Sequence, residues 1–169
     1  MNQIFNKIDK LKGFMPIHEG QALTRWSHQF STVGPILEIG SFCGKSSIYL
    51  SLGAILNNEN IFTIDHHLGS EEHQINEEYF DNEIFDYKNQ RVNTLPLLIK
   101  NINKMQVENI VPIISNSVVI ASNWNTELGM VFIDGGHSFK AANDDYESWN
   151  IKIKQNGALV IHDIFENPN

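Results

Sequence analysis

Acidic side chains at the ends of short apolar runs are the most informative feature of this sequence. Glu38 belongs to one such run and stands two residues before Gly40. Asp65, Asp134 and Asp163 follow three others. Continuous apolar runs are typical of buried parallel strands, whose carboxyl ends form a ligand site at one edge of a sheet. Carboxylates gathered there can accept hydrogen bonds from hydroxyl pairs, attract a cationic group or take up a proton. We therefore expect a site for a small molecule with a cationic or amine-bearing end.

The segment from Glu38 to Ser47 contains two glycines that approach phosphate-binding motifs without matching them. A P-loop needs a glycine five positions before Gly44, and that position is Ile39. The dinucleotide fingerprint needs three spaced glycines, whereas only Gly40 and Gly44 are present here. Two interpretations stay open: an ordinary strand-to-helix turn, or a turn whose backbone N–H groups contact a ligand other than a pyrophosphate.

Asp65 follows Gly40 at roughly the interval where an acidic residue binds the hydroxyl pair of a ribose. A carboxylate suits that role because it accepts two hydrogen bonds at once. The alternative is a solvated aspartate in a turn.

Composition restricts the function further. The 169 residues, 41% of them hydrophobic, predict a single domain over residues 1–169 with a substantial core. A net charge of −8 disfavours nucleic acid as a partner, and the apolar stretches are too short to cross a membrane. Cys43 is the only cysteine, so an intrachain disulfide is excluded and a cytoplasmic location is expected.

The elements that must position these residues alternate between strand and helix. This order predicts a doubly wound α/β domain with a mainly parallel sheet. Strands are expected at residues 36–39, 61–64, 110–114, 130–133 and 158–161. A helical N-terminal segment spans residues 1–33, with helices at 4–11 and 21–30. Further helices are expected after Gly44, with Ile55 and Leu56 on the buried stripe, after Thr94 as N-cap, over 118–124 and after Ser138.

The segment from His66 to Gln90 is acidic and has no clean periodicity. A solvated acidic insertion is one interpretation. A lid over the ligand site is the other, because long loops at strand ends often close active sites.

Four residue runs together resemble the class I S-adenosylmethionine-dependent methyltransferases, and more narrowly the macrocin O-methyltransferase-like branch that acts on small molecules. These runs are Glu38–Ser46, Thr63–His67, Val131–Phe139 and Asn156–Asp163. The resemblance implies the Rossmann-like methyltransferase fold, S-adenosylmethionine as cofactor, and methyl transfer to a small-molecule acceptor that carries a hydroxyl. Relatives in this family continue beyond the fifth strand. A domain truncated at the C-terminus and lacking the last two strands is therefore expected, with an exposed edge that favours a homo-oligomer.

The resemblance also implies roles for individual residues. The cofactor-binding set is Glu38, Gly40, Ser41 and Gly44 around the methionine portion, Asp65 and His66 at the adenosine, Asn116 and Ser117 at the adenine, and Asp134 at the methyl group. Asp134 and His137 are the catalytic candidates. His137 acts either as the general base or as a cap of the turn before Ser138.

Metal dependence and two rival functions remain as alternatives. Relatives often bind a divalent cation, and Asp134 and Asp163 offer the oxygen ligands that Mg²⁺ prefers. His162 stands where some relatives have another carboxylate, which weakens the hypothesis of a magnesium site. The rival functions are a nucleotide-dependent oxidoreductase and a non-catalytic cofactor-binding domain.

Overall fold

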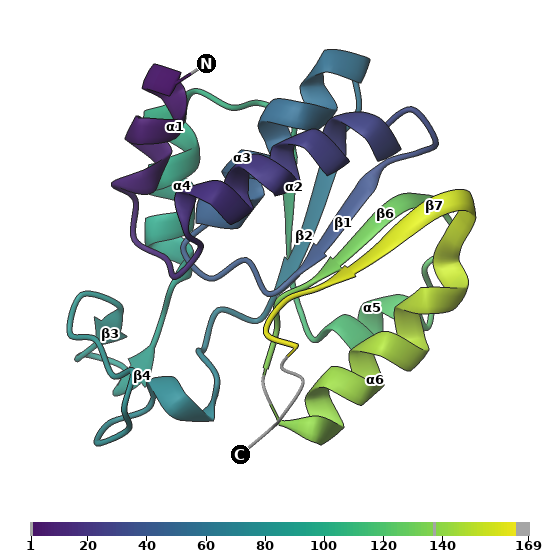
Figure 1. Cartoon of the computed structure of the whole chain (residues 1–169). Coiled ribbons are helices and arrows are strands. Elements are labelled where there is room, and N and C mark those ends of the chain that lie inside the picture. The colour runs from purple at the N-terminus through teal and green to yellow at the C-terminus, as the bar shows by residue number, and fades with distance from the viewer. Residues whose placement is uncertain (1, 137, 165–169) are drawn as a thin grey trace.

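Five parallel strands form the central sheet of the computed structural model, which describes residues 2–136 and 138–164 (Figure 1). Their spatial order is β5-β2-β1-β6-β7. The strands are β1 (Ile36–Ile39), β2 (Ile61–Asp65), β5 (Ile110–Ile114), β6 (Leu128–Ile133) and β7 (Ile153–Ile161). The predicted α/β fold with a doubly wound parallel sheet is confirmed.

Helices cover both faces of this sheet (Figure 1). On one face lie α1 (Asn2–Asp9), α2 (Ile17–Phe30), α3 (Lys45–Ala54) and α4 (Leu95–Met105). On the other lie α5 (Ser117–Ala121) and α6 (Phe139–Trp149). Each face has its own apolar core: Phe132 and Tyr49 belong to the first, and Val131 and Trp149 to the second. Alternate strand residues thus pack into opposite cores, which explains why several of the strands are largely apolar on both faces.

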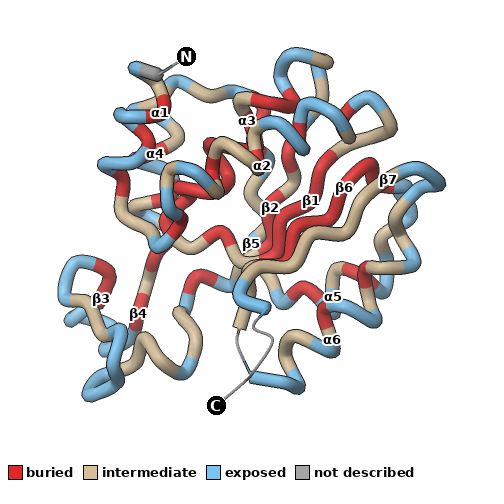
Figure 2. The backbone as a smooth tube through the Cα atoms, in the orientation of Figure 1, coloured by how far each residue is buried: buried red, intermediate tan, exposed pale blue. Residues whose placement is uncertain are grey.

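The central strands are the most deeply buried part of the molecule, and β7 at the edge of the sheet is only half-buried (Figure 2). The chain runs outward from β1 through β2 to β5, and then returns to the other side of β1 with β6 and β7. The direction of winding therefore reverses between β1 and β6. In open α/β sheets, ligands bind beside such a reversal, outside the carboxyl ends of the strands.

The helix after Gly44 is shorter than predicted. It ends at Ala54, and a 3₁₀ turn, η1 (Ile55–Asn57), follows. The prediction that Ile55 and Leu56 belong to its buried stripe is wrong, because their exposed fractions are 46% and 67%. The change from α-helix to 3₁₀ turn alters the rotation per residue and directs both side chains to solvent.

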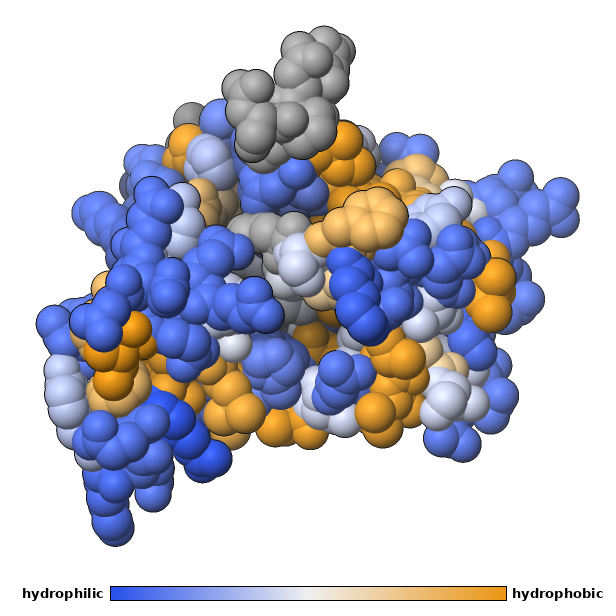
Figure 3. Space-filling model, turned by 90° about the horizontal axis from the view of Figure 1, so that it is seen from below, coloured by the Kyte–Doolittle hydropathy of each residue, from blue (hydrophilic) through white to orange (hydrophobic). Residues whose placement is uncertain are grey.

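The acidic segment forms a small unit beside the main sheet (Figure 1). It contains the 3₁₀ turn η2 (Glu71–His73) and a hairpin of two short strands, β3 (Phe85–Asp86) and β4 (Arg91–Val92). Hydrophilic side chains alternate with hydrophobic patches on the face of this unit that Figure 3 shows, and Ile75 and Tyr87 are among its exposed apolar residues. Lys12 in the N-terminal segment contacts this unit through two ion pairs. Its Nζ pairs with Asp81 and, at 2.5 Å, with Oε2 of Glu83. None of the helices within the described residues is long and apolar enough to span a bilayer.

Candidate functional site

Strand register brings three of the predicted carboxylates to the same face of the sheet. Ile39 pairs with Ile64 on one side and with Ile133 on the other. The next residues, Gly40, Asp65 and Asp134, therefore continue the three strands side by side at their carboxyl ends. Glu38 precedes Gly40 by two residues, so its side chain lies on the same face.

Gly40 lies where the backbones that follow β1 and β6 approach each other closely. Its N–H donates to the Ile64 carbonyl at 3.0 Å, and the Asp134 N–H donates to the Ile39 carbonyl at 2.8 Å. Gly40 has φ +87°, and a Cβ at this position would overlap the carbonyl oxygen of Asp134. Only glycine combines this conformation with this close approach. The glycine turn is therefore required by the packing at the switch point.

Asp65 orders the loop that follows Gly40. One carboxylate oxygen accepts the Phe42 N–H at 2.8 Å, and the other accepts the His67 N–H at 2.7 Å. Phe42 has φ +47°, which is costly for a residue with a side chain, so this bond offsets local strain. Each oxygen keeps a second lone pair for a ligand hydroxyl. His66 is half-exposed at the same turn, with Nδ1 4.0 Å from Asp65.

Glu38 lies deeper than the sequence suggested. Its side chain is fully buried, and its oxygens accept hydrogen bonds from Ser46 Oγ at 2.5 Å and from Ser47 Oγ. Burial raises the pKa of Glu38 to about 7, although the serine hydroxyls act in the opposite direction. Glu38 therefore lies beneath the first turn of α3, where its charge acts over a short distance and in a low dielectric.

Ser41 supplies an orphaned polar atom in the same loop. Its side chain is buried, and its Oγ has no hydrogen-bond partner among the described residues. Its carbonyl accepts the Gly44 N–H at 2.7 Å, and Gly44 has φ +85° at the start of α3. A buried hydroxyl without a partner costs about 1–3 kcal/mol, which a polar group of a ligand would recover. The loop therefore fits a small polar ligand.

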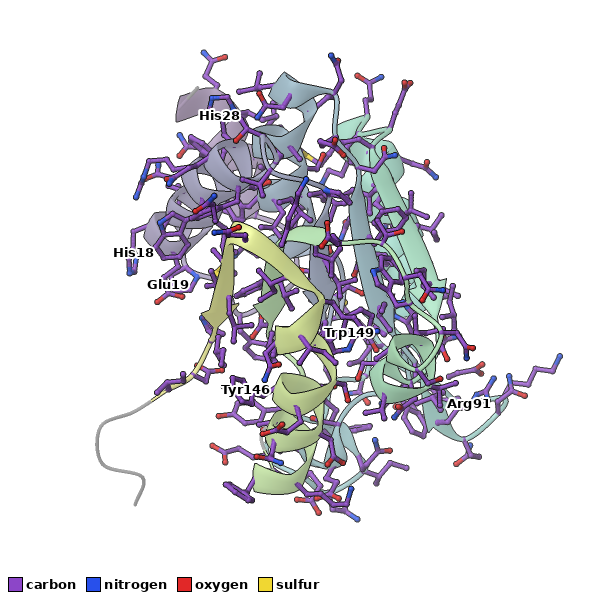
Figure 4. All side chains as sticks on the ribbon, turned by 90° about the vertical axis from the view of Figure 1, so that its right-hand side faces the viewer. His18, Glu19, His28, Arg91, Tyr146 and Trp149 are labelled. Atoms are coloured by element: carbon purple, nitrogen blue, oxygen red, sulfur yellow. The ribbon has the colours of Figure 1, made fainter. Side chains whose placement is uncertain are left out.

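A cluster of charged side chains lies at the ends of β6 and β7. His162 Nδ1 lies 3.2 Å from Asp134 and 3.0 Å from Asp163, and its Nε2 lies 2.8 Å from Glu19 on α2. Figure 4 shows Glu19 on the side of the molecule where β7 lies. Asp134 chiefly, together with Glu19 and Asp163, raises the pKa of His162 to about 10 against the opposing effect of burial. The imidazole is therefore a cation among three carboxylates at neutral pH.

This cluster bears on the predicted magnesium site. Asp134, His162 and Asp163 bring donor atoms within 4.8 Å of one another. However, both carboxylates lie against the same nitrogen of His162, Nδ1, whose raised pKa means that a metal would have to displace a proton from it. Mg²⁺ also prefers oxygen ligands throughout. The arrangement does not fit Mg²⁺, and we assign no chemistry to a metal here.

The same cluster predicts the effect of removing its cation. His162→Leu is expected to lower the free energy of unfolding at pH 7.5 by about 2 kcal/mol, because three carboxylates would face one another without a counter-charge. Urea unfolding measures this difference. His18→Leu is the matched control, because it removes a histidine beside the same Glu19. His18 is exposed, and its contact with Glu19 is longer, at 3.7 Å. Equal stability of the two variants would show that the cluster does not hold β7 against α2.

The remaining predicted residues are placed as follows. Asn116 accepts the Val118 N–H at 3.0 Å and so caps α5, and the Ser117 hydroxyl bonds to the buried carboxylate of Asp145. Both residues lie just beyond β5, as expected. However, the side-chain oxygens that were expected to contact the adenine already have hydrogen-bond partners within the protein. His137 lies outside the described residues.

Sequence reasoning missed three members of the site. Ser46 and Ser47, the partners of Glu38, directly follow Lys45 at the start of α3, so hydroxyls at a helix start below a carboxylate were the available signal. Glu19 is 143 residues from His162, and no spacing in the sequence indicates their contact.

Comparison with known proteins places this geometry in context. Residues 37–164 match a family model described as a methyltransferase domain. This range begins in β1 and ends just beyond Asp163, so it includes every candidate residue of the site except Glu19.

Solved structures with the same fold are similar over almost the whole chain. A protein from Corynebacterium glutamicum is 14% identical, with 96% of this chain and 68% of that one covered and a TM-score of 0.67. A caffeoyl-CoA O-methyltransferase from Staphylococcus aureus, described as putative in its name, is 17% identical, with 95% of this chain and 63% of that one covered and a TM-score of 0.58. The O-methyltransferase TomG from Streptomyces achromogenes, in complex with SAM, is 19% identical, with 94% of this chain and 61% of that one covered and a TM-score of 0.60. These low identities establish the fold alone. The chain spans less than two thirds of the length of the last two proteins.

Proposed function

Because the chain belongs to the methyltransferase domain family, we propose that it transfers a methyl group from S-adenosylmethionine to a hydroxyl oxygen of a small molecule. The motif runs 131–139 and 156–163 support the macrocin O-methyltransferase-like branch as its subgroup. The O-methyltransferases among the structural neighbours agree with oxygen as the accepting atom.

One observation carries this proposal. Gly40 continues β1 between Asp65 on β2 and Asp134 after β6, at the point where the winding of the sheet reverses. The buried, unpartnered Ser41 hydroxyl lies in the loop between them. A ligand with hydroxyl groups at one end and a positive charge at the other would meet complementary groups along this edge.

The proposed roles follow from these positions. Asp65 would bind the ribose hydroxyls, with His66 beside the adenosine, and Ser41 together with the backbone at Gly40 and Gly44 would bind the methionine portion. Glu38 would act from below as a buried counter-charge. Asn116 and Ser117 would line the adenine side mainly through their backbone, since their side chains already have partners.

Methyl transfer itself needs little covalent assistance from the protein. The acceptor oxygen forms a bond to the methyl carbon while the carbon–sulfur bond breaks, and that electron pair stays on the sulfur. The hydroxyl proton must pass to a base, for which Asp134 and His137 are the proposed residues. Alignment of the two reactants can supply on the order of 7–11 kcal/mol of the barrier reduction in such a reaction.

Asp65→Asn tests the cofactor assignment. Calorimetric titration with S-adenosylhomocysteine is expected to show at least about tenfold weaker binding, because the amide cannot accept from both loop N–H groups and also bind a ribose. Asp86→Asn is the matched control, since Asp86 also accepts backbone N–H groups, those of Lys88 and Asn89, but in the exposed acidic segment. Equal affinity in both variants would refute the role of Asp65.

A methyl-release assay beside this titration separates the rival functions. Binding of S-adenosylhomocysteine without turnover on a broad panel of hydroxyl compounds would favour a non-catalytic binding domain. Binding of NADH in preference to S-adenosylhomocysteine would favour an oxidoreductase.

A further inference from the structure

A cavity of about 170 Å³, partly open to solvent, lies between α2 and the ends of β6 and β7. Its walls are mainly apolar. They are formed by Met15, Leu23 and Trp26 on the helical side and by Phe132 and Val160 on the sheet. Phe132 and Val160 stand in register on neighbouring strands, two residues before Asp134 and His162. The cavity therefore ends at the same edge as the proposed site of methyl transfer.

The cavity persists because α2 is fixed to α3 on its other side. A Cβ at Gly20 would overlap the ring of Tyr49, so the two helices already touch at this point. Thr24 Oγ1 donates to the Tyr49 carbonyl at 2.8 Å, and Ser27 Oγ donates to the Leu50 carbonyl at 2.6 Å. These contacts keep α2 from moving across the sheet to fill the space above β7.

One end of the cavity is polar and carries net negative charge. Glu19 and His162 line it, and Asp134 and Asp163 contact the same imidazole. Three carboxylates around one imidazolium attract a hydroxyl hydrogen and repel an anion.

We propose that this cavity is the acceptor subsite and that it takes an uncharged single-ring phenol, with its hydroxyl directed to the Glu19–His162 end. The inference rests on the proposed methyltransferase function. The volume of the cavity is sufficient for one aromatic ring, because an apolar cavity of about 150 Å³ in another protein accommodates benzene. Trp26 and Phe132 offer ring faces and edges for contact with an aromatic acceptor. The apolar walls and the negative charge at the polar end both disfavour a ring that bears a carboxylate.

The test compares two ligands of nearly equal size, 4-hydroxybenzyl alcohol and 4-hydroxybenzoate. An NMR titration that follows the Trp26 indole N–H is expected to show at least about tenfold tighter binding of the alcohol, since a carboxylate para to the bound hydroxyl would be desolvated against the apolar walls. Ala22→Phe, which fills the cavity from α2, is expected to abolish binding of the alcohol. Gln29→Phe adds the same ring at an exposed position of α2 and should bind as the wild type does.

Trp26→Ala provides a second readout that does not depend on tolerance of a larger side chain, because Trp26 is 41% exposed. Isothermal calorimetry replaces NMR here because the variant lacks the indole N–H, and it should show binding of the alcohol weakened by about fivefold, as expected for the loss of one aromatic contact. Unchanged binding in Ala22→Phe, or a preference for 4-hydroxybenzoate, would overturn the proposal. Calorimetry with S-adenosylhomocysteine on the same variants keeps the two questions apart. If the wild type does not bind S-adenosylhomocysteine, the proposed function is contradicted. If it binds S-adenosylhomocysteine but not the phenol, only the assignment of the cavity as the acceptor subsite is contradicted.

Discussion

Gly40→Ala is expected to lower the free energy of unfolding by about 3 kcal/mol and to abolish measurable binding of S-adenosylhomocysteine. A left-handed backbone conformation costs a non-glycine residue about 1–2 kcal/mol, and relief of an overlap in a packed region costs a similar amount. Both apply here, because Gly40 has φ +87° and its missing Cβ would overlap the carbonyl of Asp134.

The overlap partner is backbone, so no side-chain rotation can relieve it. The strained loop must instead move away from β6 and carry Ser41 and the Phe42 N–H with it. For a domain of this size, the expected loss of stability lowers the thermal midpoint by roughly 6–12 °C. Differential scanning calorimetry measures this shift, and isothermal titration measures the loss of cofactor binding.

Gly136→Ala is the matched control. A Cβ at this position would lie 3.4 Å from the Ala141 Cβ, which is an ordinary contact distance, and the φ of Gly136 lies outside the left-handed region. This variant should change the thermal midpoint little. Similar behaviour of the two variants would show that the contact between the β1 and β6 loops does not form as described.

The regular part of the fold could be predicted because it depends on local patterns. Most of the predicted strands are largely apolar runs, and alternate residues such as Val131 and Phe132 enter different cores. The first part of β7 was missed, because the strand begins at Ile153 and passes through the exposed polar residues 154–156 before the predicted run 158–161. The hairpin in the acidic segment could not be predicted in this way. Its strands have two residues each, and Phe85 and Val92 are buried against Cys43 from a distant loop.

The candidate site shows the same division. Strand ends indicated Asp65 and Asp134 because register follows from parallel pairing. Side-chain partners were less accessible to sequence reasoning. Thr94 occupies the N-cap position of α4 as predicted, but its hydroxyl makes no capping bond and instead lies 2.7 Å from His67 Nδ1. The Glu19–His162 pair depends on the path of α2 across the sheet, which no local pattern encodes.

Glu38→Gln is expected to remove a pH dependence that the buried carboxyl group imposes on stability. In the unfolded chain this group loses its proton near the ordinary glutamate pKa of 4.5, whereas the folded protein retains the proton up to a pKa of about 7. The folded state therefore binds more protons between these values, and the free energy of unfolding falls as pH rises through this window. The stability that Glu38 contributes below pH 4.5 is lost above pH 7 and amounts to about 3 kcal/mol.

Urea unfolding of the wild type and Glu38→Gln from pH 5 to pH 8.5 measures this contribution. The difference between their free energies of unfolding removes the effect of the other titrating groups, which the two proteins share. The variant should gain stability relative to the wild type as pH rises. Glu147→Gln, an exposed position on α6, controls for the change in net charge. A constant difference between wild type and Glu38→Gln across this range would exclude the proposed shift.

The same carboxyl group should couple cofactor binding to pH. A cationic ligand near Glu38 favours the ionised form, so below pH 7 the carboxyl must release a proton when the ligand binds. The affinity of the wild type for S-adenosylhomocysteine, whose amino group is cationic, should therefore fall by up to about tenfold for each pH unit below 7. Glu38→Gln should bind more weakly at pH 8 and should lose this component of the slope. Equal slopes in the two proteins would mean that the cation lies too far from Glu38 to interact with it, and the buried carboxyl would then serve only to hold Ser46 and Ser47 at the start of α3.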